Sequence, residues 1–299
     1  MNEQTRWHDW EIREKLGSGS YGQVYRIERT SFGFTEQSAL KVMRIPQSRE
    51  DYESVLSESA SGEDTACYFK GMVHEIVKEI EIMSQFKGHS NIVSYEDFEV
   101  RELEGGCSWE IFIRMELLTP LATWLKTHPI LVADVVRIGT DICSALEMCS
   151  RKQVIHRDVK PANIFYSAQD TFKIGDFGIA RSMESTSTAT AKRGTPAYMA
   201  PEVYKGERYD ATVDLYSLGI VLYQLLNNNR APFLPPYPDP IRHTDRETST
   251  RKRMSGDPMP LPCNAQNALG EVVLKACAYR PEDRYQSAEE LREALQEAV

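Results

Sequence analysis

The chain has 299 residues, of which 41% are hydrophobic and 26% charged, as in an ordinary globular protein. A chain of this length corresponds to about two domains or one large two-lobed unit, and it can bury roughly three quarters of its unfolded surface. The formal net charge of −9 argues against a general nucleic-acid-binding surface, although it is compatible with a local basic pocket for phosphates. These values exclude a disordered chain and a fibrous repeat.

Neither a targeting segment nor a cysteine motif for redox or zinc chemistry is visible in the sequence. The longest nearly apolar stretch, 215–226, is shorter than the roughly 20 residues that a membrane-spanning helix needs, and residues 1–10 lack the apolar core of a signal peptide. The six cysteines form no C-x-x-C pair and do not combine with histidines at zinc-ligand spacing. We therefore expect reduced thiols and a cytoplasmic location.

The first part of the chain predicts strands. Residues 10–16 and 23–27 roughly alternate between apolar and polar side chains, and residues 39–43 are a third candidate strand. Residues 48–65 are polar and acidic and predict a loop or a weak helix, after which apolar residues between 72 and 83 recur at helical spacing. Further strands are predicted at 92–100 and 109–116.

The second part predicts mostly helices. Helical periodicity covers 133–150, 213–226, 265–277 and 287–298. The stretch 227–262 is rich in proline and basic residues and predicts an irregular excursion with a short helix at 245–254. The pattern indicates a small sheet-rich lobe and a larger helical lobe, separated by a hinge near 118–121.

A glycine-rich segment lies between the first two predicted strands. It reads Gly17-Ser18-Gly19-Ser20-Tyr21-Gly22. A dinucleotide-binding glycine motif would open a helix, whereas this one joins two strands and predicts a hairpin over phosphates, or a plain glycine-rich hairpin.

A strand lysine and a helical glutamate form a candidate pair. Lys41 lies on the third predicted strand, where a lysine is often only a solvated edge residue. A lysine that points into a cleft needs a charged partner to offset its desolvation. Glu79, on the predicted helix, is one candidate, and helical geometry alone does not separate it from Glu75 or Glu81.

The next motifs decide the interpretation. His156-Arg157-Asp158-Val159-Lys160-Pro161-Ala162-Asn163 is followed by Asp176-Phe177-Gly178 and then by Ala200-Pro201-Glu202. Together with the glycine-rich segment and Lys41, these motifs resemble the eukaryotic-type protein kinase family, serine/threonine branch, in order along the chain. Tyr216, where many animal kinases carry tryptophan, resembles the bacterial branch. The resemblance covers about residues 10–295.

The resemblance implies a fold, an activity and a location. The fold is α+β and two-lobed, with an antiparallel sheet and one main helix in residues 1–117 and a mostly helical lobe in residues 118–299. The activity is transfer of the γ-phosphate of ATP to protein serine and threonine hydroxyls, with Mg²⁺ or Mn²⁺ as the metal. The chain would be cytoplasmic or the cytoplasmic domain of a longer membrane-anchored kinase.

The resemblance also assigns roles to residues. Asp158 would orient the substrate hydroxyl, Lys160 would contact the γ-phosphate, and Asn163 and Asp176 would bind the metal through oxygen atoms. Lys41, held by Glu79, would contact the α- and β-phosphates, with Glu79 chosen for its distance before His89-Ser90-Asn91. The nucleotide-binding set is completed by Leu16, Gly17, Ser18, Gly19, Ser20, Tyr21, Gly22, Val24, Ala39, Met115, Glu116, Leu118 and Phe165.

Structural and regulatory roles follow from the same resemblance. Glu202 would pair with Arg284, and Asp214 would anchor the catalytic-loop backbone. Met83, Phe177 and His156, with Tyr95, would stack as a regulatory spine. Thr195 would bond Asp158 and Lys160. The hydroxyls between Ser182 and Thr190, Thr188 and Thr190 above all, would accept phosphate and pair with Arg157.

Two other functions compete with an active protein kinase. A pseudokinase scaffold is disfavoured because Lys41, Asp158, Asn163 and Asp176 are all present. A small-molecule kinase is disfavoured by the long activation segment and the Ala200-Pro201-Glu202 motif, which build a groove for a polypeptide. The expected partners are protein substrates and a transient second copy for phosphorylation in trans, with no nucleic acid and no membrane segment within this chain.

Overall fold

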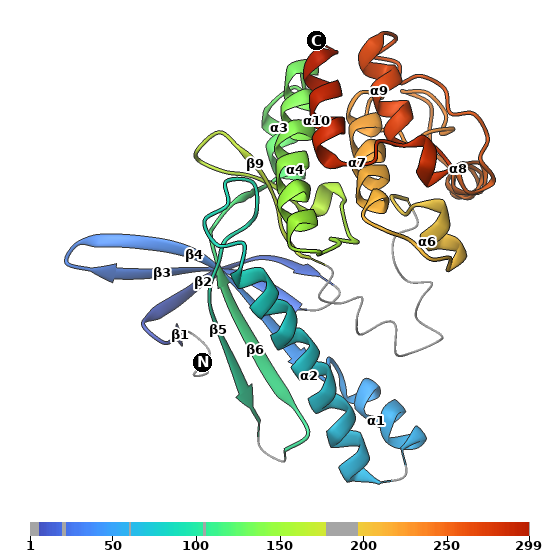
Figure 1. Ribbon diagram of the computed structural model, residues 1–299. Helices are drawn as coiled ribbons and strands as arrows, with labels where there is room; N and C mark the ends of the chain where they lie inside the picture. The colour runs from blue at the N-terminus through green and yellow to red at the C-terminus, as the bar shows by residue number, and fades with distance from the viewer. Residues whose placement is uncertain (1–5, 20–21, 60, 104–105, 178–196, 299) are drawn as a thin grey trace. The chain divides into compact units, whose positions relative to one another are not determined.

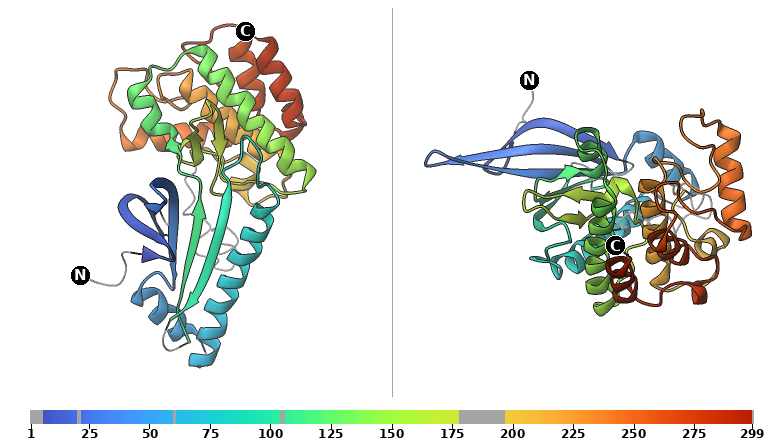
Figure 2. Two further views of the ribbon diagram at one scale, coloured as in Figure 1. Left: turned by 90° about the vertical axis from the view of Figure 1, so that its left-hand side faces the viewer. Right: turned by 90° about the horizontal axis from the view of Figure 1, so that it is seen from above.

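A computed structural model describes residues 6–19, 22–59, 61–103, 106–177 and 197–298. The chain divides into two compact units (Figures 1 and 2). One is built on residues 6–89 and 93–118, which we call the sheet unit. The other contains residues 90–92 and 119–177 and the described C-terminal part from 197 onward, which we call the helical unit. An α+β organisation with a small antiparallel sheet and a larger helical part was expected, and it is confirmed.

The sheet unit contains one antiparallel sheet in the order β1-β2-β3-β4-β6-β5. Its strands are β1 (Arg6–Trp7), β2 (Trp10–Gly19), β3 (Gly22–Ser31), β4 (Phe34–Ile45), β5 (Tyr95–Glu102) and β6 (Trp109–Met115). A buried cluster of Trp7, Trp10, Ile27, Leu40 and Phe112 forms part of its core. The β-branched and aromatic residues of these strands suit a pleated surface with one buried face.

Two helices accompany the sheet, where the sequence indicated a loop or weak helix followed by one helix. They are α1 (Arg49–Glu58) and α2 (Gly62–Ser84), and α2 contacts β4 and β5. Ser48 and Ser61 cap these helices through their hydroxyls, which accept the backbone N–H groups of Asp51 and Asp64. The serine caps therefore explain why an acidic stretch without a strong apolar pattern is helical.

The helical unit surrounds an apolar helix. Its helices are α3 (Leu121–Thr127), α4 (Val132–Arg151), α6 (Pro201–Lys205), α7 (Thr212–Leu225), α8 (His243–Ser255), α9 (Ala268–Ala276) and α10 (Ala288–Glu297), with short 3-10 turns at η1 (Pro161–Asn163) and η2 (Pro281–Asp283). Helix α7 is buried on nearly all sides and packs against α4 and α9, while α10 packs against α4. Gly219 permits the close approach of α9, because a Cβ there would lie 2.6 Å from the Cys277 sulfur.

A small second sheet takes two of its strands from the chain between the motif at 156–163 and Asp176. Strands β7 (Thr119–Pro120), β8 (Ile164–Tyr166) and β9 (Phe172–Ile174) pair in that order, all antiparallel. Asn91 fixes this sheet, because its amide donates to the Phe172 carbonyl at 3.0 Å and its own carbonyl accepts the Ile174 N–H at 2.9 Å. No helix in the described ranges is both long and apolar enough to cross a membrane.

Candidate active site

The loop from His156 to Asn163 is fixed from the core of the helical unit. The buried carboxylate of Asp214, in the first turn of α7, accepts the backbone N–H of His156 at 2.7 Å and that of Arg157 at 2.8 Å. Arg157 has a φ of 64°, so the chain turns sharply at this point. Anchoring of the loop by Asp214, expected from the sequence, is confirmed.

The carboxylate of Asp158 is held by two side chains of the same loop. Asn163 Nδ2 donates to Asp158 Oδ2 at 2.8 Å and to the Asp158 carbonyl at 2.8 Å. Lys160 Nζ lies 2.7 Å from Asp158 Oδ2. Asp158 is thus presented in one orientation beside a cation, which is an arrangement suited to orienting a hydroxyl group next to a negatively charged substrate.

The strand that follows brings Asp176 to the same loop. The Gly175 N–H donates to the Asn163 carbonyl at 2.9 Å, and Asn163 Nδ2 lies 3.5 Å from the Asp176 carbonyl. Asp176 itself has a φ of 51°, in the left-handed region that non-glycine residues rarely adopt. The structure therefore brings Asp158, Lys160, Asn163 and Asp176 together within the helical unit.

A buried histidine joins the two segments. His156 Nδ1 accepts the Asp158 N–H at 3.2 Å, which leaves Nε2 to donate to the Gly175 carbonyl at 3.2 Å. The ring also packs against Phe177 with 4.5 Å between ring centroids. His156 and Phe177 thus make the contact expected of two members of the regulatory spine. The other two, Met83 and Tyr95, are buried within the sheet unit.

One face of the sheet unit carries the remaining candidates. Lys41 on β4 is directly opposite Val24 on β3 and Ile113 on β6, and Ala39 is directly opposite Met115. Residues opposite each other in an antiparallel pair, and residues two apart on one strand, project from the same face. Lys41, Val24, Ala39 and Met115 therefore share one face of the sheet.

The glycine-rich segment is a hairpin between β2 and β3, as the sequence indicated. Gly17 is opposite Val24 and Gly19 is opposite Gly22, while Ser20 and Tyr21 lie outside the described residues. A Cβ at Gly22 would lie 2.2 Å from the Val42 carbonyl oxygen, so only glycine fits there. Leu16 and Ser18 are exposed on the strand that leads into this hairpin.

The side-chain environments on α2 distinguish the three glutamates that helical geometry alone left open. Glu75 is exposed and pairs with Lys78 at 2.7 Å, and Glu81 is also exposed. Glu79 is partly buried beside the apolar stripe of Ile76, Ile80 and Met83. Glu79 is thus the glutamate of the three whose position suits an inward ion pair.

After β6, Glu116 is fixed by reciprocal bonds with Ser94. The Glu116 carboxylate accepts the Ser94 N–H at 2.7 Å, and the Glu116 N–H donates to the Ser94 carbonyl at 3.2 Å. Leu118 ends the sheet unit two residues later, and Phe165 lies on β8 of the helical unit, opposite Lys173. These bonds attach the first residue of the predicted hinge to the chain that leads into β5.

Comparison with known proteins now identifies the chain. The family described as "Protein kinase domain" matches residues 10–296. The chain belongs to this family. The expected resemblance to protein kinases, and the α+β kinase fold that it implied, are confirmed.

Named relatives of the kinase domain are serine/threonine-protein kinases from bacteria and eukaryotes. ULK3 of Xenopus laevis is 34% identical over 236 residues, covering 76% of this chain and 44% of the relative. PknB of Mycolicibacterium smegmatis is 38% identical over 173 residues, covering 56% and 26%, and Pkn1 of Myxococcus xanthus is 30% identical over 304 residues, covering 99% and 39%. The aligned part is less than half of each relative's length. The domain is that of a protein serine/threonine kinase, and the bacterial relatives agree with the branch that Tyr216 indicated.

The remaining predicted residues lie outside the loop from His156 to Asn163. The predicted pair of Glu202 and Arg284 is confirmed, with two bonds of 2.7 and 2.8 Å between buried groups. No sequence motif indicated Tyr209, whose ring centre lies 5.8 Å from the Arg157 guanidinium carbon. Gly178, Thr195 and the predicted phosphorylation sites between Ser182 and Thr190 lie outside the described residues.

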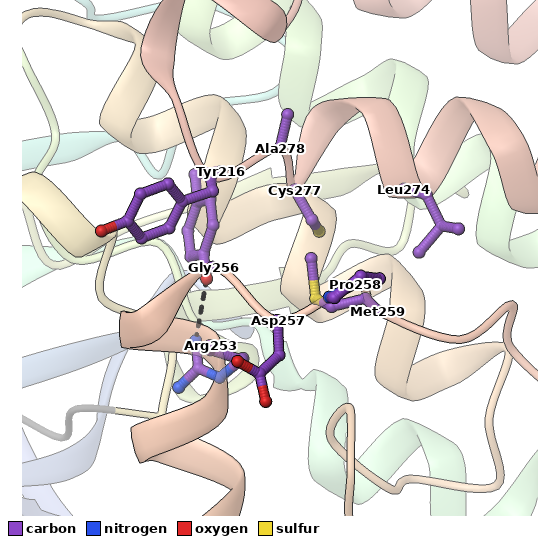
Figure 3. A pocket seen from close by; sticks show the side chains of 10 residues that line it. Tyr216, Arg253, Gly256, Asp257, Pro258, Met259, Leu274, Cys277 and Ala278 are labelled. Carbon is purple, nitrogen blue, oxygen red and sulfur yellow. Dashed lines mark hydrogen bonds between the residues drawn. The ribbon is translucent and has the colours of Figure 1, made fainter.

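A cavity of about 200 Å³ lies among the ends of α7, α8 and α9 (Figure 3). Arg253 Nη1 donates to the Tyr216 hydroxyl at 3.2 Å along its wall, and burial raises the pKa of the neighbouring Cys277 thiol to about 12. No residue of the predicted active site lines this cavity.

Proposed function

We propose that this kinase domain transfers the γ-phosphoryl group of ATP to serine and threonine hydroxyls of proteins. The observation that carries the proposal is the fixed Asp158 carboxylate, bonded by Asn163 and adjacent to Lys160 in a loop anchored by Asp214. Phosphoryl transfer depends mainly on positioning and charge neutralisation, which such an arrangement provides.

The residues of the helical unit have separate roles in this proposal. Asp158 accepts a hydrogen bond from the substrate hydroxyl and orients its oxygen for in-line attack. Lys160 contacts the γ-phosphate and offsets its charge. Neither role requires the protein to form a covalent bond.

The oxygen atoms of Asn163 and Asp176 suit Mg²⁺, with Mn²⁺ as a substitute. Asn163 Nδ2 is engaged with Asp158, which turns Oδ1 of the same amide to the other side as an oxygen donor. The described residues contain no group of three or more His, Cys, Asp and Glu that forms a metal site alone. This donor set fits Mg²⁺, which usually binds one or two protein oxygens together with water and substrate phosphates. The bound ion would neutralise phosphate charge during transfer.

The sheet unit supplies the nucleotide contacts in this proposal. The hairpin of Gly17, Gly19 and Gly22 covers the phosphates, and Lys41, oriented by Glu79, holds the α- and β-phosphates. Val24 and Ala39 contact the adenine, supported by their place on the same sheet face as Lys41. The other proposed nucleotide contacts are Leu16, Ser18, Ser20, Tyr21, Met115, Glu116, Leu118 and Phe165.

Activation is proposed to occur by phosphorylation of the segment from Ser182 to Thr190 by a transiently bound second copy. We also propose a cytoplasmic location, either for this chain or for the part of a longer membrane-anchored protein that contains it. Residues 1–117 and residues 118–299 are proposed to form the two lobes of the enzyme, as expected from the sequence. Mass spectrometry after incubation with ATP and Mg²⁺ tests activation. Absence of phosphate from residues 182–190 would exclude it.

The main test compares four proteins in a phosphate-transfer assay with ATP, Mg²⁺ and a generic protein substrate. Lys41→Met and Asp158→Asn are expected to lose activity by about 10²-fold or more, because each removes a positioning or charge-neutralising group. Asp239→Asn, at an exposed position outside the site, is the matched control and should retain the wild-type rate. A wild-type protein that binds nucleotide without transferring phosphate would indicate a pseudokinase. Equal rates for wild type and Asp158→Asn would contradict the proposed role of Asp158.

A further inference from the structure

The β3–β4 hairpin extends past both neighbouring strands. β2 pairs with β3 only as far as Glu28, whose partner on β4 is Gln37, and β6 pairs with β4 only from Ala39 onward, so residues 29–36 form a two-stranded ribbon. This ribbon projects from the rest of the sheet in Figures 1 and 2. A two-stranded ribbon has marginal stability in water, so its length adds little to the fold.

The end of the ribbon carries two exposed aromatic rings, Phe32 and Phe34, which we call the aromatic tip. Phe32 is fully exposed and Phe34 is 71% exposed, the two highest values among the large hydrophobic side chains that the structure describes. Phe32 has a φ of 50° and Gly33 a φ of 80°. Such turns favour asparagine, aspartate or glycine, so a phenylalanine here is sterically unfavourable and gains no burial within its own fold. This combination points to a contact outside the fold.

The helical unit has a surface pocket with matching properties. Its volume is about 260 Å³, and six aliphatic side chains at 130–132, 135 and 225–226 line it together with Asn264, so no charged group is present. Leu131 and Val132, at the start of α4, are 63% and 40% exposed. A cavity of about 150 Å³ with similar lining binds benzene, so this aliphatic pocket has room for a phenyl ring.

We propose that the aromatic tip of one copy docks into the aliphatic pocket of a second copy. The two surfaces agree in polarity and charge, since residues 30–35 carry no charged side chain and neither does the pocket. An anionic lipid surface is a poorer partner. Arg29, the nearest basic residue, pairs with Glu36 at 2.7 Å, and the ribbon therefore offers no net positive charge. The contact goes beyond phosphoryl transfer and needs no nucleotide.

The area that the two rings can bury limits how tightly two copies associate. An aromatic side chain buries about 150–250 Å², so two rings and the surface that they cover amount to roughly 600–1,000 Å² in total. A stable interface needs about 1,200 Å² or more, and the association is therefore weak and transient. Because the two surfaces differ, the contact is head-to-tail and grows beyond a dimer as concentration rises, unless a ring closes.

Sedimentation of the 299-residue chain without ATP tests the contact. The tip variant is Phe32→Asn with Phe34→Thr, which suits the turn, and the pocket variant is Leu131→Asn with Val132→Gln, which places a favoured cap residue before α4. The average mass of wild type should rise up to about 0.3 mM, whereas each variant should associate about tenfold or more weakly. An equimolar mixture of the two variants should form dimers and nothing larger, because each such pair keeps one intact tip and one intact pocket.

Phe98→Thr, which removes an exposed phenylalanine from β5, is the matched control and should associate like wild type. Thermal melting verifies that every variant is folded. The proposal is wrong if wild type stays monomeric, if the mixture stays monomeric, or if Phe98→Thr weakens association equally. Binding of wild type, but not of the tip variant, to phosphatidylglycerol vesicles without self-association would assign the aromatic tip to lipid instead.

Discussion

The buried pair of Glu202 and Arg284 offers a quantitative test of the helical unit. Both side chains are almost completely buried, at 5% and 0% exposure, and two parallel bonds join them. Arg284 also donates to the Ala278 carbonyl at 2.8 Å and the Tyr279 carbonyl at 3.1 Å. One guanidinium therefore links α6 to the chain that follows α9.

Arg284→Met should destabilise the protein by about 3–5 kcal/mol, because it leaves a buried carboxylate without its cation. At about 2–4 °C per kcal/mol for a unit of this size, the melting temperature should fall by roughly 6–20 °C. The double variant Glu202→Leu with Arg284→Met removes both charges, so its remaining loss comes from the three backbone carbonyls that accept from Arg284, those of Thr212, Ala278 and Tyr279, at about 1 kcal/mol each. The double variant should therefore be more stable than Arg284→Met.

Urea unfolding followed by circular dichroism measures these differences. Arg49→Met, which breaks the exposed ion pair with Glu53, is the matched control and should change stability little. The free energy of unfolding is also measured for Glu202→Leu alone. If the double variant loses as much stability as Arg284→Met and Glu202→Leu lose together, the argument is refuted, because additivity would mean that the two groups do not interact.

Three further predictions concern sterics, thiol chemistry and pH. Gly22→Ala should destabilise the sheet unit by about 1–3 kcal/mol, measured by thermal melting, because its Cβ would overlap the Val42 carbonyl; Gly17→Ala, with nothing within 4 Å of its Cβ, is the control. A thiol reagent at pH 8 should label three accessible cysteines in the native protein, Cys67, Cys107 and Cys263. The buried Cys143, Cys149 and Cys277 should react only after unfolding, since burial raises the pKa of Cys149 and Cys277 to about 12 and the pKa of Cys143 further. Fast labelling of any buried thiol in the native protein would contradict this prediction. Burial raises the pKa of Asp141, so the folded state favours the protonated carboxyl group. The protonated carboxyl group therefore contributes stability at low pH, and this contribution is lost as the pH rises through the raised pKa. Asp141→Asn keeps an acceptor for the Phe172 N–H and should stabilise the protein more at pH 7 than at pH 4, an expectation that equal gains at both pH values would reject.

Much of the fold could be predicted from the spacing of apolar residues along the chain. The helices predicted at 133–150, 213–226 and 287–298 agree with α4, α7 and α10 within a residue or two, because each is long and has a clear apolar pattern. Helix α1 and the beginning of α2 were not predicted as firm helices, since their residues are mostly polar and exposed. The Ser48 and Ser61 caps, each followed three residues later by an aspartate, were the signal available.

The candidate site, like the fold, was predicted only in part from the sequence. The motifs predicted which residues carry chemistry, and Asp214 and Glu202 make the contacts expected of them. Helical geometry alone did not distinguish Glu79 from Glu75 and Glu81, and only the distance to His89 in the family pattern favoured Glu79 before burial was known. The position of Tyr209 under Arg157 depends on two segments far apart in the chain, and local pattern holds no information on such a contact.

The two bonds from Asp214 have a consequence for how this protein tolerates change. The N–H groups of His156 and Arg157 are attached to the first turn of a helix that is enclosed by other helices. A substitution deep in that helix, far from any substrate, would tilt the attachment point and displace the Asp158 carboxylate by the same rotation. Variants of this kind should also lose stability, because the helix is buried, and their loss of turnover should persist at temperatures well below their own melting temperature.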